Sequence, residues 1–282
     1  MKRVGVIGTG TMGCGIAQVA AQNGYEVIFQ NRRQESVDRG LAGIKKSLER
    51  MVAKEKLTAA QSTEALGHIR GAVPMAELKG CDIVIESAPE DLALKQGLFE
   101  ALDPILGENA VIATNTSSLS VTKLASFVNR PGHFIGMHFF NPVPMMKLVE
   151  VVKGYRTTSD TVARVRTFAE ALGKLPIDVK DAPGFVVNRV LFPMINEAAY
   201  ALGEGVADAT GIDECMKGGC NHPMGPLALA DLVGLDVVHA ILESLYREYG
   251  NPRYAPSIEI KKRVEAGWLG RKTGRGFYDY GK

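Results

Sequence analysis

The chain has 282 residues, of which 46% are hydrophobic and 23% are charged. This composition excludes a disordered or fibrous protein and allows a large buried core. The 33 Lys and Arg side chains oppose 31 Asp and Glu side chains, so the formal net charge of +2 predicts binding neither to nucleic acid nor to an anionic membrane. Every apolar run is interrupted well before the ~20 residues of a membrane helix. Because the four cysteines are also scattered, we expect a soluble protein of the reducing cytoplasm, with no membrane segment.

Short apolar runs alternate with helical segments up to about residue 180. The predicted strands are 3–7, 26–30, 83–86, 110–114, 134–138 and 148–152, and helical patterns cover 12–23 and the long amphipathic region 35–66. Such alternation is typical of a parallel sheet whose crossover helices cover both faces. The sequence therefore predicts an α/β fold with a doubly wound, mostly parallel sheet.

The pattern changes at 181–184, after which only long helical stretches follow, at 185–202 and 227–249. We therefore expect a dinucleotide-binding domain over 1–182 and an all-helical domain over 183–282. The segment 211–235 is rich in Gly, Ala, Met and Leu and has few charges. Two interpretations stay open for it: a homodimer interface, with the second domain as substrate and dimerisation domain, or packing within the chain.

A glycine-rich turn follows the first predicted strand and precedes the first predicted helix. Its residues match the G-x-G-x-x-G pattern and are Gly8, Thr9, Gly10, Thr11, Met12 and Gly13. In such a turn the first glycine allows the tight bend, the second lets the backbone approach a pyrophosphate, and the third permits close packing of helix on strand. The helix N-terminus supplies amide donors for the negative charge. This context predicts a dinucleotide site, the alternative being a glycine turn without a ligand.

The second predicted strand ends at Gln30 and is followed by Asn31, Arg32 and Arg33. An NAD-binding protein usually has an acidic residue there, which bonds the ribose hydroxyls. No carboxylate is present to repel a 2′-phosphate, and two guanidinium groups are placed to hold one. We therefore expect NADP(H) to be favoured over NAD(H). In the alternative interpretation the arginines are solvated and Asn31 bonds the ribose of NAD.

Polar residues in apolar surroundings mark the candidate chemistry. Asn115 and Ser117 follow a predicted strand, at the edge where open α/β sheets bind ligands. His138 stands among apolar residues, and Glu150, twelve residues later, lies in another apolar strand where an unpaired carboxylate would be costly. A His138–Glu150 pair satisfies both groups, because the carboxylate fixes the tautomer and the second ring nitrogen can exchange a proton with an alcohol.

Other polar residues carry weaker signals. Asn188 is interpreted either as a surface residue or as a substrate contact. Cys215, Cys220 and His222 have an unusual spacing without an evident fourth ligand, so no metal site is expected. The basic residues of 45–56 have the pattern of a solvated helix face, although such a face also suits a phosphorylated carrier.

Five segments together resemble one enzyme family nearly from end to end: GTGTMG at 8–13, NTSSL at 115–119, HFFNPVPMMKLVEV at 138–151, PGFVVNR at 183–189 and GRKTGRGFYDY at 270–280. They are similar to the 3-hydroxyacyl-CoA dehydrogenases, and most similar to the bacterial short-chain branch. The resemblance implies a Rossmann-type domain, a helical dimerising domain and an acyl-CoA thioester substrate. For the short-chain branch, the implied reaction interconverts (S)-3-hydroxybutyryl-CoA and acetoacetyl-CoA.

Matched position by position, the resemblance implies that His138 is the catalytic general acid and base and that Glu150 orients it. Ser117 and Asn188 would hold the reacting oxygen and the thioester carbonyl of the substrate, and Ser47 and Lys54 would contact coenzyme A. The implied cofactor-site residues are Glu90, Lys95, Asn115, Asn141 and Lys272. Asn31 departs from the aspartate of most of the family, which agrees with the preference for NADP(H). Two rival hypotheses are a dehydrogenase of a free β-hydroxy acid and a catalytically silent dinucleotide-binding relative.

Overall fold

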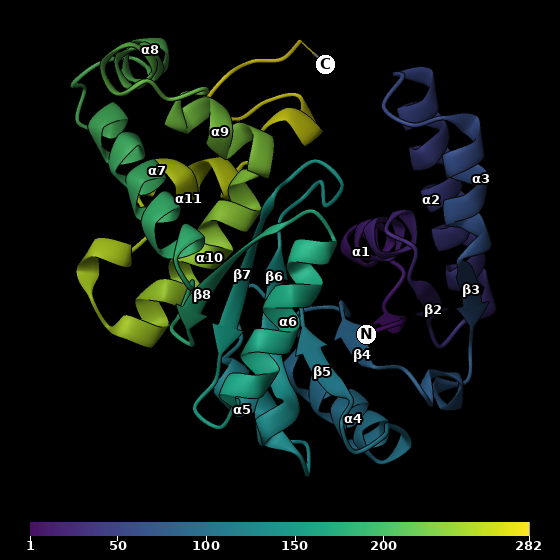
Figure 1. The fold of residues 1–282 in the computed structure, drawn as a ribbon. Coiled ribbons are helices and arrows are strands. Elements are labelled where there is room, and N and C mark those ends of the chain that lie inside the picture. The colour runs from purple at the N-terminus through teal and green to yellow at the C-terminus, as the bar shows by residue number, and fades with distance from the viewer. Residues whose placement is uncertain (282) are drawn as a thin grey trace. The chain divides into compact units, whose positions relative to one another are not determined.

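The computed structural model describes residues 1–281, and the chain divides into two compact units, one of Met1–Ala182 and one that starts at Pro183. The first unit contains a sheet of eight strands, and the second is helical (Figure 1). Both features agree with the predicted fold class, which is confirmed. None of the helices within residues 1–281 is long and apolar enough to cross a bilayer.

The sheet has the strand order β3-β2-β1-β4-β5-β6-β7-β8. Its strands are β1 (Arg3–Ile7), β2 (Glu26–Gln30), β3 (Ile69–Ala72), β4 (Ile83–Glu86), β5 (Val111–Thr114), β6 (Phe134–Phe139), β7 (Leu148–Lys153) and β8 (Leu175–Lys180). All neighbours are parallel except β6 and β7, which are antiparallel. The chain order reverses between β1 and β4, which creates the crevice where doubly wound sheets bind their ligands.

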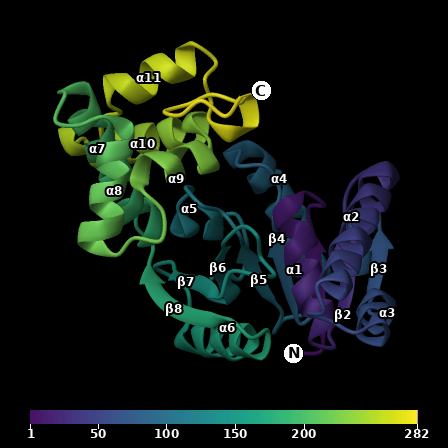
Figure 2. The ribbon, with the colours of Figure 1, turned by 90° about the horizontal axis from the view of Figure 1, so that it is seen from above.

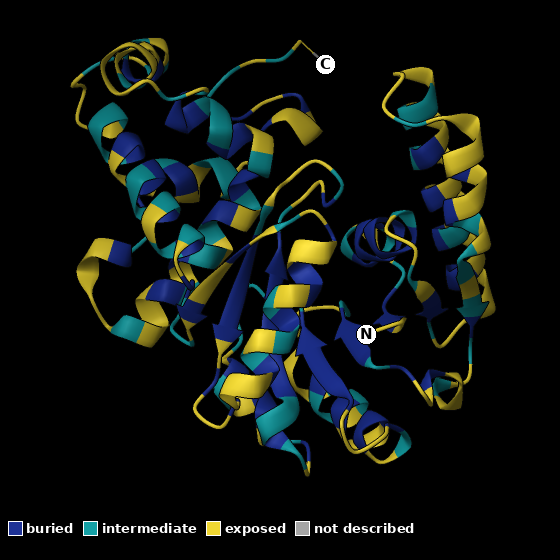
Figure 3. Ribbon diagram, viewed as in Figure 1, coloured by how far each residue is buried: buried dark blue, intermediate teal, exposed yellow. Residues whose placement is uncertain are grey.

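Helices cover both faces of this sheet (Figure 2). The first unit contains α1 (Thr11–Gln22), α2 (Gln34–Ala53), α3 (Ala59–Gly67), α4 (Leu92–Leu102), α5 (Val121–Ala125) and α6 (Ser159–Ala171). On one face α1 and α6 share an apolar cluster with the central strands. On the other face α4 packs edge-to-face through Phe99 on Phe134 of β6. The central strands are buried on both faces (Figure 3), which explains why they appear in the sequence as continuous apolar runs.

The structure adds two strands that the sequence analysis did not identify and divides the long amphipathic region. β3 and β8 are the two edge strands, so they are only partly buried and lack an apolar run. The region 35–66 is two helices, because α2 ends before Lys54 and Thr58 starts α3 with a capping box to Gln61.

The second unit consists of α7 (Val187–Gly203), α8 (Ala209–Cys220), α9 (Pro226–Val233), α10 (Leu235–Tyr249) and α11 (Ile258–Glu265). Its core includes Ile195, Leu227, Leu242 and Ile260, all fully buried. The predicted helix 227–249 is divided at Gly234, whose φ of 103° lies outside the helical region. Glycine alone adopts this conformation without strain, so α9 ends and α10 begins there.

Candidate active site

In the glycine turn between β1 and α1, two glycines lie so close to the backbone that no side chain fits, and a third lies open. A Cβ at Gly8, whose φ is 100°, would lie 2.4 Å from the Ser87 carbonyl oxygen, and one at Gly13 would lie 1.9 Å from the carbonyl oxygen of Gly8. A Cβ at Gly10 would meet no atom within 4 Å. Because no side chain caps α1, its first amides and the open backbone at Gly10 remain available for an anion.

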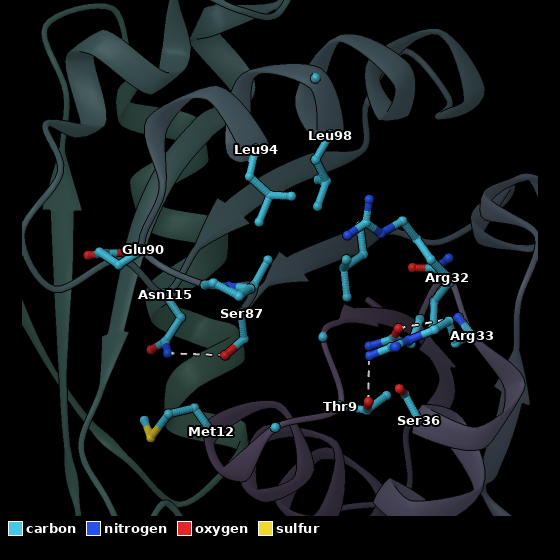
Figure 4. Close-up of a pocket in the computed structure, with 18 of the residues that line it drawn as sticks. Thr9, Met12, Arg32, Arg33, Ser36, Ser87, Glu90, Leu94, Leu98 and Asn115 are labelled. Carbon is cyan, nitrogen blue, oxygen red and sulfur yellow. Dashed lines mark hydrogen bonds between the residues drawn. The ribbon is translucent and has the colours of Figure 1, made fainter.

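A cavity of about 1240 Å³ lies beside this turn within the first unit (Figure 4). Arg32 and Arg33 lie at one end of it, and Glu90 and Asn115 at the other. Of the predicted cofactor and substrate residues, the structure brings the following to the cavity wall: Gly8, Thr9, Gly10, Thr11, Met12, Asn31, Arg32, Arg33, Glu90, Asn115 and Ser117. The wall opposite the turn includes Leu94 and Leu98 of α4, which the sequence analysis did not single out.

At the end of β2 the side chain of Asn31 ties two backbone segments together. Its Nδ2 donates to Thr9 Oγ1 at 3.0 Å, and its Oδ1 accepts from the Arg33 amide at 3.4 Å. Both arginine side chains are exposed, and no side chain caps the N-terminus of α2 that follows them. This corner of the cavity therefore combines two cations with uncapped helix amides, an arrangement suited to a phosphate group.

At the other end Glu90 organises the segment after β5. Its Oε1 accepts from Thr116 Oγ1 at 2.6 Å and from the amides of Ser117 and Ser118 at 2.8 and 2.9 Å. Burial raises the pKa of Glu90, but the Lys95 ammonium and these hydrogen bonds outweigh burial and hold the pKa below its usual value. The carboxylate thus stays ionised and the Ser117 backbone stays anchored to it.

Lys95 is not among the residues that line the cavity. Its side chain is 1% exposed, and its Nζ lies 2.6 Å from Glu86 Oε1 and 3.4 Å from Glu90 Oε2. Two other predicted cofactor residues of the first unit, Gly13 and Asn141, also lie outside the cavity wall. Gly13 is covered by the turn itself, and Asn141 is exposed in the loop after β6.

The antiparallel pairing of β6 with β7 places His138 directly opposite Glu150. Their side chains therefore project from the same face of the sheet, and His138 Nδ1 lies 2.7 Å from Glu150 Oε2. The two residues are 7% and 1% exposed. Next to His138, the Phe139 amide donates to Oδ1 of the cavity residue Asn115 at 2.9 Å. The predicted pair thus exists and is joined through Asn115 to the cavity.

With a carboxylate at Nδ1, the imidazole carries its proton on that nitrogen, and Nε2 is the basic position. The carboxylate also stabilises the imidazolium that forms when Nε2 takes a proton. This arrangement can abstract a proton from an alcohol or return one to an alkoxide.

The remaining predicted residues lie on helices of either unit. Ser47 and Lys54 are seven residues apart, so they share one face at the end of α2, away from the cavity wall. In the second unit, Asn188 is 8% exposed in the first turn of α7, and Lys272 Nζ lies 2.5 Å from Asp236 Oδ1. Cys215 and Cys220 are both exposed on α8, and residues 1–281 hold no group of three or more His, Cys, Asp or Glu arranged as metal ligands.

One buried residue that the sequence analysis missed is Glu86, the last residue of β4, which is fully buried. The signal for it was present, because a carboxylate that ends an apolar strand needs a partner as much as Glu150 does. Applied at 83–86, the same reasoning would have found it.

Comparisons with known proteins cover nearly the whole chain. Residues 3–182 match the family model described as "3-hydroxyacyl-CoA dehydrogenase, NAD binding domain", and residues 184–280 match "3-hydroxyacyl-CoA dehydrogenase, C-terminal domain". The 3-hydroxybutyryl-CoA dehydrogenase of Clostridioides difficile is 49% identical over 280 residues, which are 99% of this chain and 100% of that protein. The mitochondrial hydroxyacyl-coenzyme A dehydrogenase of Mus musculus is 42% identical over 288 residues, 99% of this chain and 91% of the relative. The crystal structure of (S)-3-hydroxybutyryl-CoA dehydrogenase from Ralstonia eutropha has a TM-score of 0.97 at 52% identity and covers both chains fully.

Proposed function

The chain belongs to the 3-hydroxyacyl-CoA dehydrogenase family, and on that basis we propose that it interconverts (S)-3-hydroxybutyryl-CoA and acetoacetyl-CoA with a nicotinamide cofactor. The observation that carries the proposal is the buried contact of 2.7 Å between His138 and Glu150. This pair supplies the general acid and base that oxidation of an alcohol requires.

The residues present fit a dinucleotide. Gly10 leaves the backbone open where a pyrophosphate approaches, and α1 offers uncapped amides. The cavity extends from Arg32 and Arg33 to Asn115 and Ser117, so one end suits the adenosine half and the other the reactive half. The cofactor, when bound, supplies or accepts the hydride.

In the reducing direction, His138 donates a proton from Nε2 to the oxygen on C3 of the substrate. Glu150 stabilises the imidazolium before that transfer and holds the ring in place by its bond to Nδ1. Ser117 and Asn188 bond the reacting oxygen and the thioester carbonyl, and Ser47 and Lys54 contact coenzyme A. In the oxidising direction His138 takes the proton back.

We further propose a preference for NADP(H). No carboxylate ends β2, and Arg32 and Arg33 line the cavity beside the uncapped N-terminus of α2. A 2′-phosphate would meet two guanidinium groups and a helix dipole there, whereas the ribose of NAD would find no carboxylate acceptor.

Purified protein is expected to oxidise reduced nicotinamide when acetoacetyl-CoA is added, and to oxidise NADPH faster than NADH at equal concentrations. Absorbance at the nicotinamide band measures both rates. Faster oxidation of NADH would contradict the preference but keep the reaction. Turnover of free acetoacetate but not of its thioester would support the free-acid dehydrogenase, and no turnover despite cofactor binding would support the silent relative.

The variant Asn31→Asp tests whether the end of β2 sets the preference between NADPH and NADH. Its carboxylate repels a 2′-phosphate and accepts bonds from ribose hydroxyls, so the ratio of the NADPH rate to the NADH rate is expected to fall. An unchanged ratio in this variant would show that the end of β2 does not select the cofactor.

A homodimer formed through the second unit is also proposed. That unit exposes several large apolar side chains, among them Val190 at 67%, Val206 at 72% and Ile258 at 55%. Covering such side chains with a second copy removes apolar area from water. Light scattering at micromolar concentration is expected to give twice the chain mass of 30.4 kDa; the mass of a single chain would contradict the dimer.

A further inference from the structure

Glu86 is a buried carboxylate whose two oxygens are both bonded. Its Oε1 accepts from the Ala88 amide and from Lys95 Nζ, each at 2.6 Å, and its Oε2 accepts from Thr114 Oγ1 at 2.6 Å. Glu86 is 0% exposed and Lys95 is 1% exposed. Burying two charged groups carries a desolvation cost. Because this pair lies at the edge of the sheet that faces the cavity, we expect it to have a role beyond stability.

The first connection from Glu86 to the substrate segment runs through Thr114. The Thr114 hydroxyl donates to Glu86, and its oxygen accepts from the Thr116 amide at 3.3 Å. Because its only hydrogen is used on Glu86, the hydroxyl is oriented with its lone pairs toward that amide. Glu86 thereby fixes the start of the Thr116–Ser118 segment.

The second connection runs through Lys95 and Glu90. The Lys95 ammonium lies between the carboxylates of Glu86 and Glu90, at 2.6 and 3.4 Å. Glu90 in turn accepts from the amides of Ser117 and Ser118. Each oxygen of Glu86 is therefore connected to the segment 116–118. One oxygen is connected through Thr114, and the other through Lys95 and Glu90.

We propose that Glu86 is a positioning residue for Ser117, which it holds through Thr114 on one side and through Lys95 and Glu90 on the other. The inference rests on the proposed function, in which Ser117 bonds the reacting oxygen of the substrate. It also gives Lys95 a role within the site, because Lys95 links Glu86 to Glu90.

Neutralising Glu86 disturbs both connections. A glutamine keeps the shape of the side chain, but it has one acceptor oxygen where three donors converge, and its NH₂ must face Lys95 or Thr114. If it faces Thr114, it competes with the Thr116 amide for the hydroxyl oxygen. If it faces Lys95, the ammonium is left with Glu90 as its one carboxylate partner and moves toward it. Either change displaces the Ser117 segment.

Glu86→Gln is expected to lower kcat/KM for acetoacetyl-CoA by roughly 10- to 100-fold, the range expected for misplacement of a substrate-holding group. The Kd of NADPH, measured without substrate, is expected to change much less. Asp103→Asn is the matched control, because Asp103 is 3% exposed and paired with Arg130 at 2.9 Å, away from the site residues. It removes a buried carboxylate and is expected to lower the melting temperature without lowering kcat/KM.

Two results with folded Glu86→Gln would overturn the proposal: a kcat/KM equal to that of the parent protein, or an equal loss in kcat/KM and in NADPH affinity. If Glu86→Gln does not fold, Thr114→Val tests the proposal in its place. This variant removes the connection through Thr114 and leaves the Glu86–Lys95 ion pair intact. A drop in kcat/KM with unchanged NADPH affinity is expected, and an unchanged kcat/KM would overturn the role.

Hydrogen exchange separates this proposal from the proposed function. The Ser117 and Ser118 amides are expected to exchange faster in Glu86→Gln, or in Thr114→Val, than in the parent protein, whichever substrate the enzyme uses. If the parent protein does not turn over acetoacetyl-CoA, the proposed function fails while this measurement still tests the positioning. Unchanged exchange at both amides would overturn the positioning alone.

Discussion

Replacement of His138 with glutamine is expected to lower kcat for acetoacetyl-CoA reduction by about 10²–10⁴-fold, the usual contribution of a general acid or base. Glutamine retains a polar side chain opposite Glu150 but has no group that can act as an acid or a base in the reaction. The Kd of NADPH is expected to stay near that of the parent protein, because His138 is not among the residues that line the cavity. Steady-state kinetics and fluorescence titration of the cofactor measure the two effects.

The control for this prediction is His239→Gln. His239, which is half-buried on α10, also has a glutamate partner, the exposed Glu243, with His239 Nε2 3.8 Å from Glu243 Oε1. This variant removes a histidine with the same kind of neighbour outside the proposed site, and kcat is expected to be retained. Near-full activity of His138→Gln would remove His138 as the base.

Replacement of Glu150 with glutamine is expected to lower kcat by about 10²-fold or more, as in other sites where a carboxylate orients a histidine. The glutamine NH₂ donates to His138 Nδ1 in place of accepting from it, so the ring proton moves to Nε2. In the oxidising direction, the nitrogen that must take the substrate proton is then already protonated. The loss of the negative charge also removes the group that stabilises the imidazolium.

Comparison of kcat with the melting temperature distinguishes this effect from simple loss of structure. In Glu150→Gln, the imidazolium lacks its anionic partner, so kcat is expected to fall in a protein that remains folded at the assay temperature. Glu243→Gln, the equivalent change in the pair on α10, is expected to leave kcat as it is. A folded Glu150→Gln enzyme with the parent kcat would show that the carboxylate does not act on His138.

The dinucleotide turn and the central strands were predictable from the sequence because they depend on local rules. Gly8 and Gly13 are needed wherever a strand turns sharply into a helix that packs closely on it, and the apolar runs of β1, β4 and β5 follow from burial on both faces. The His138–Glu150 pair was also predicted, from the cost of burying either group alone. These features follow from the residue types themselves and do not depend on which strands lie side by side.

Tertiary structure decided what depends on strand register and on edges. Twelve residues of sequence separate His138 from Glu150, and only the antiparallel register of β6 and β7 puts them opposite each other. Edge strands β3 and β8 bury too little to show an apolar run, and Gly234 divides a continuous helical pattern by its backbone angle. The burial of Lys95 between Glu86 and Glu90 joins β4, α4 and the segment after β5. The sequence thus determined the residue types that the fold and the chemistry require, while partners far apart in the chain were chosen by sheet order and packing, because such contacts form only when several elements are in place.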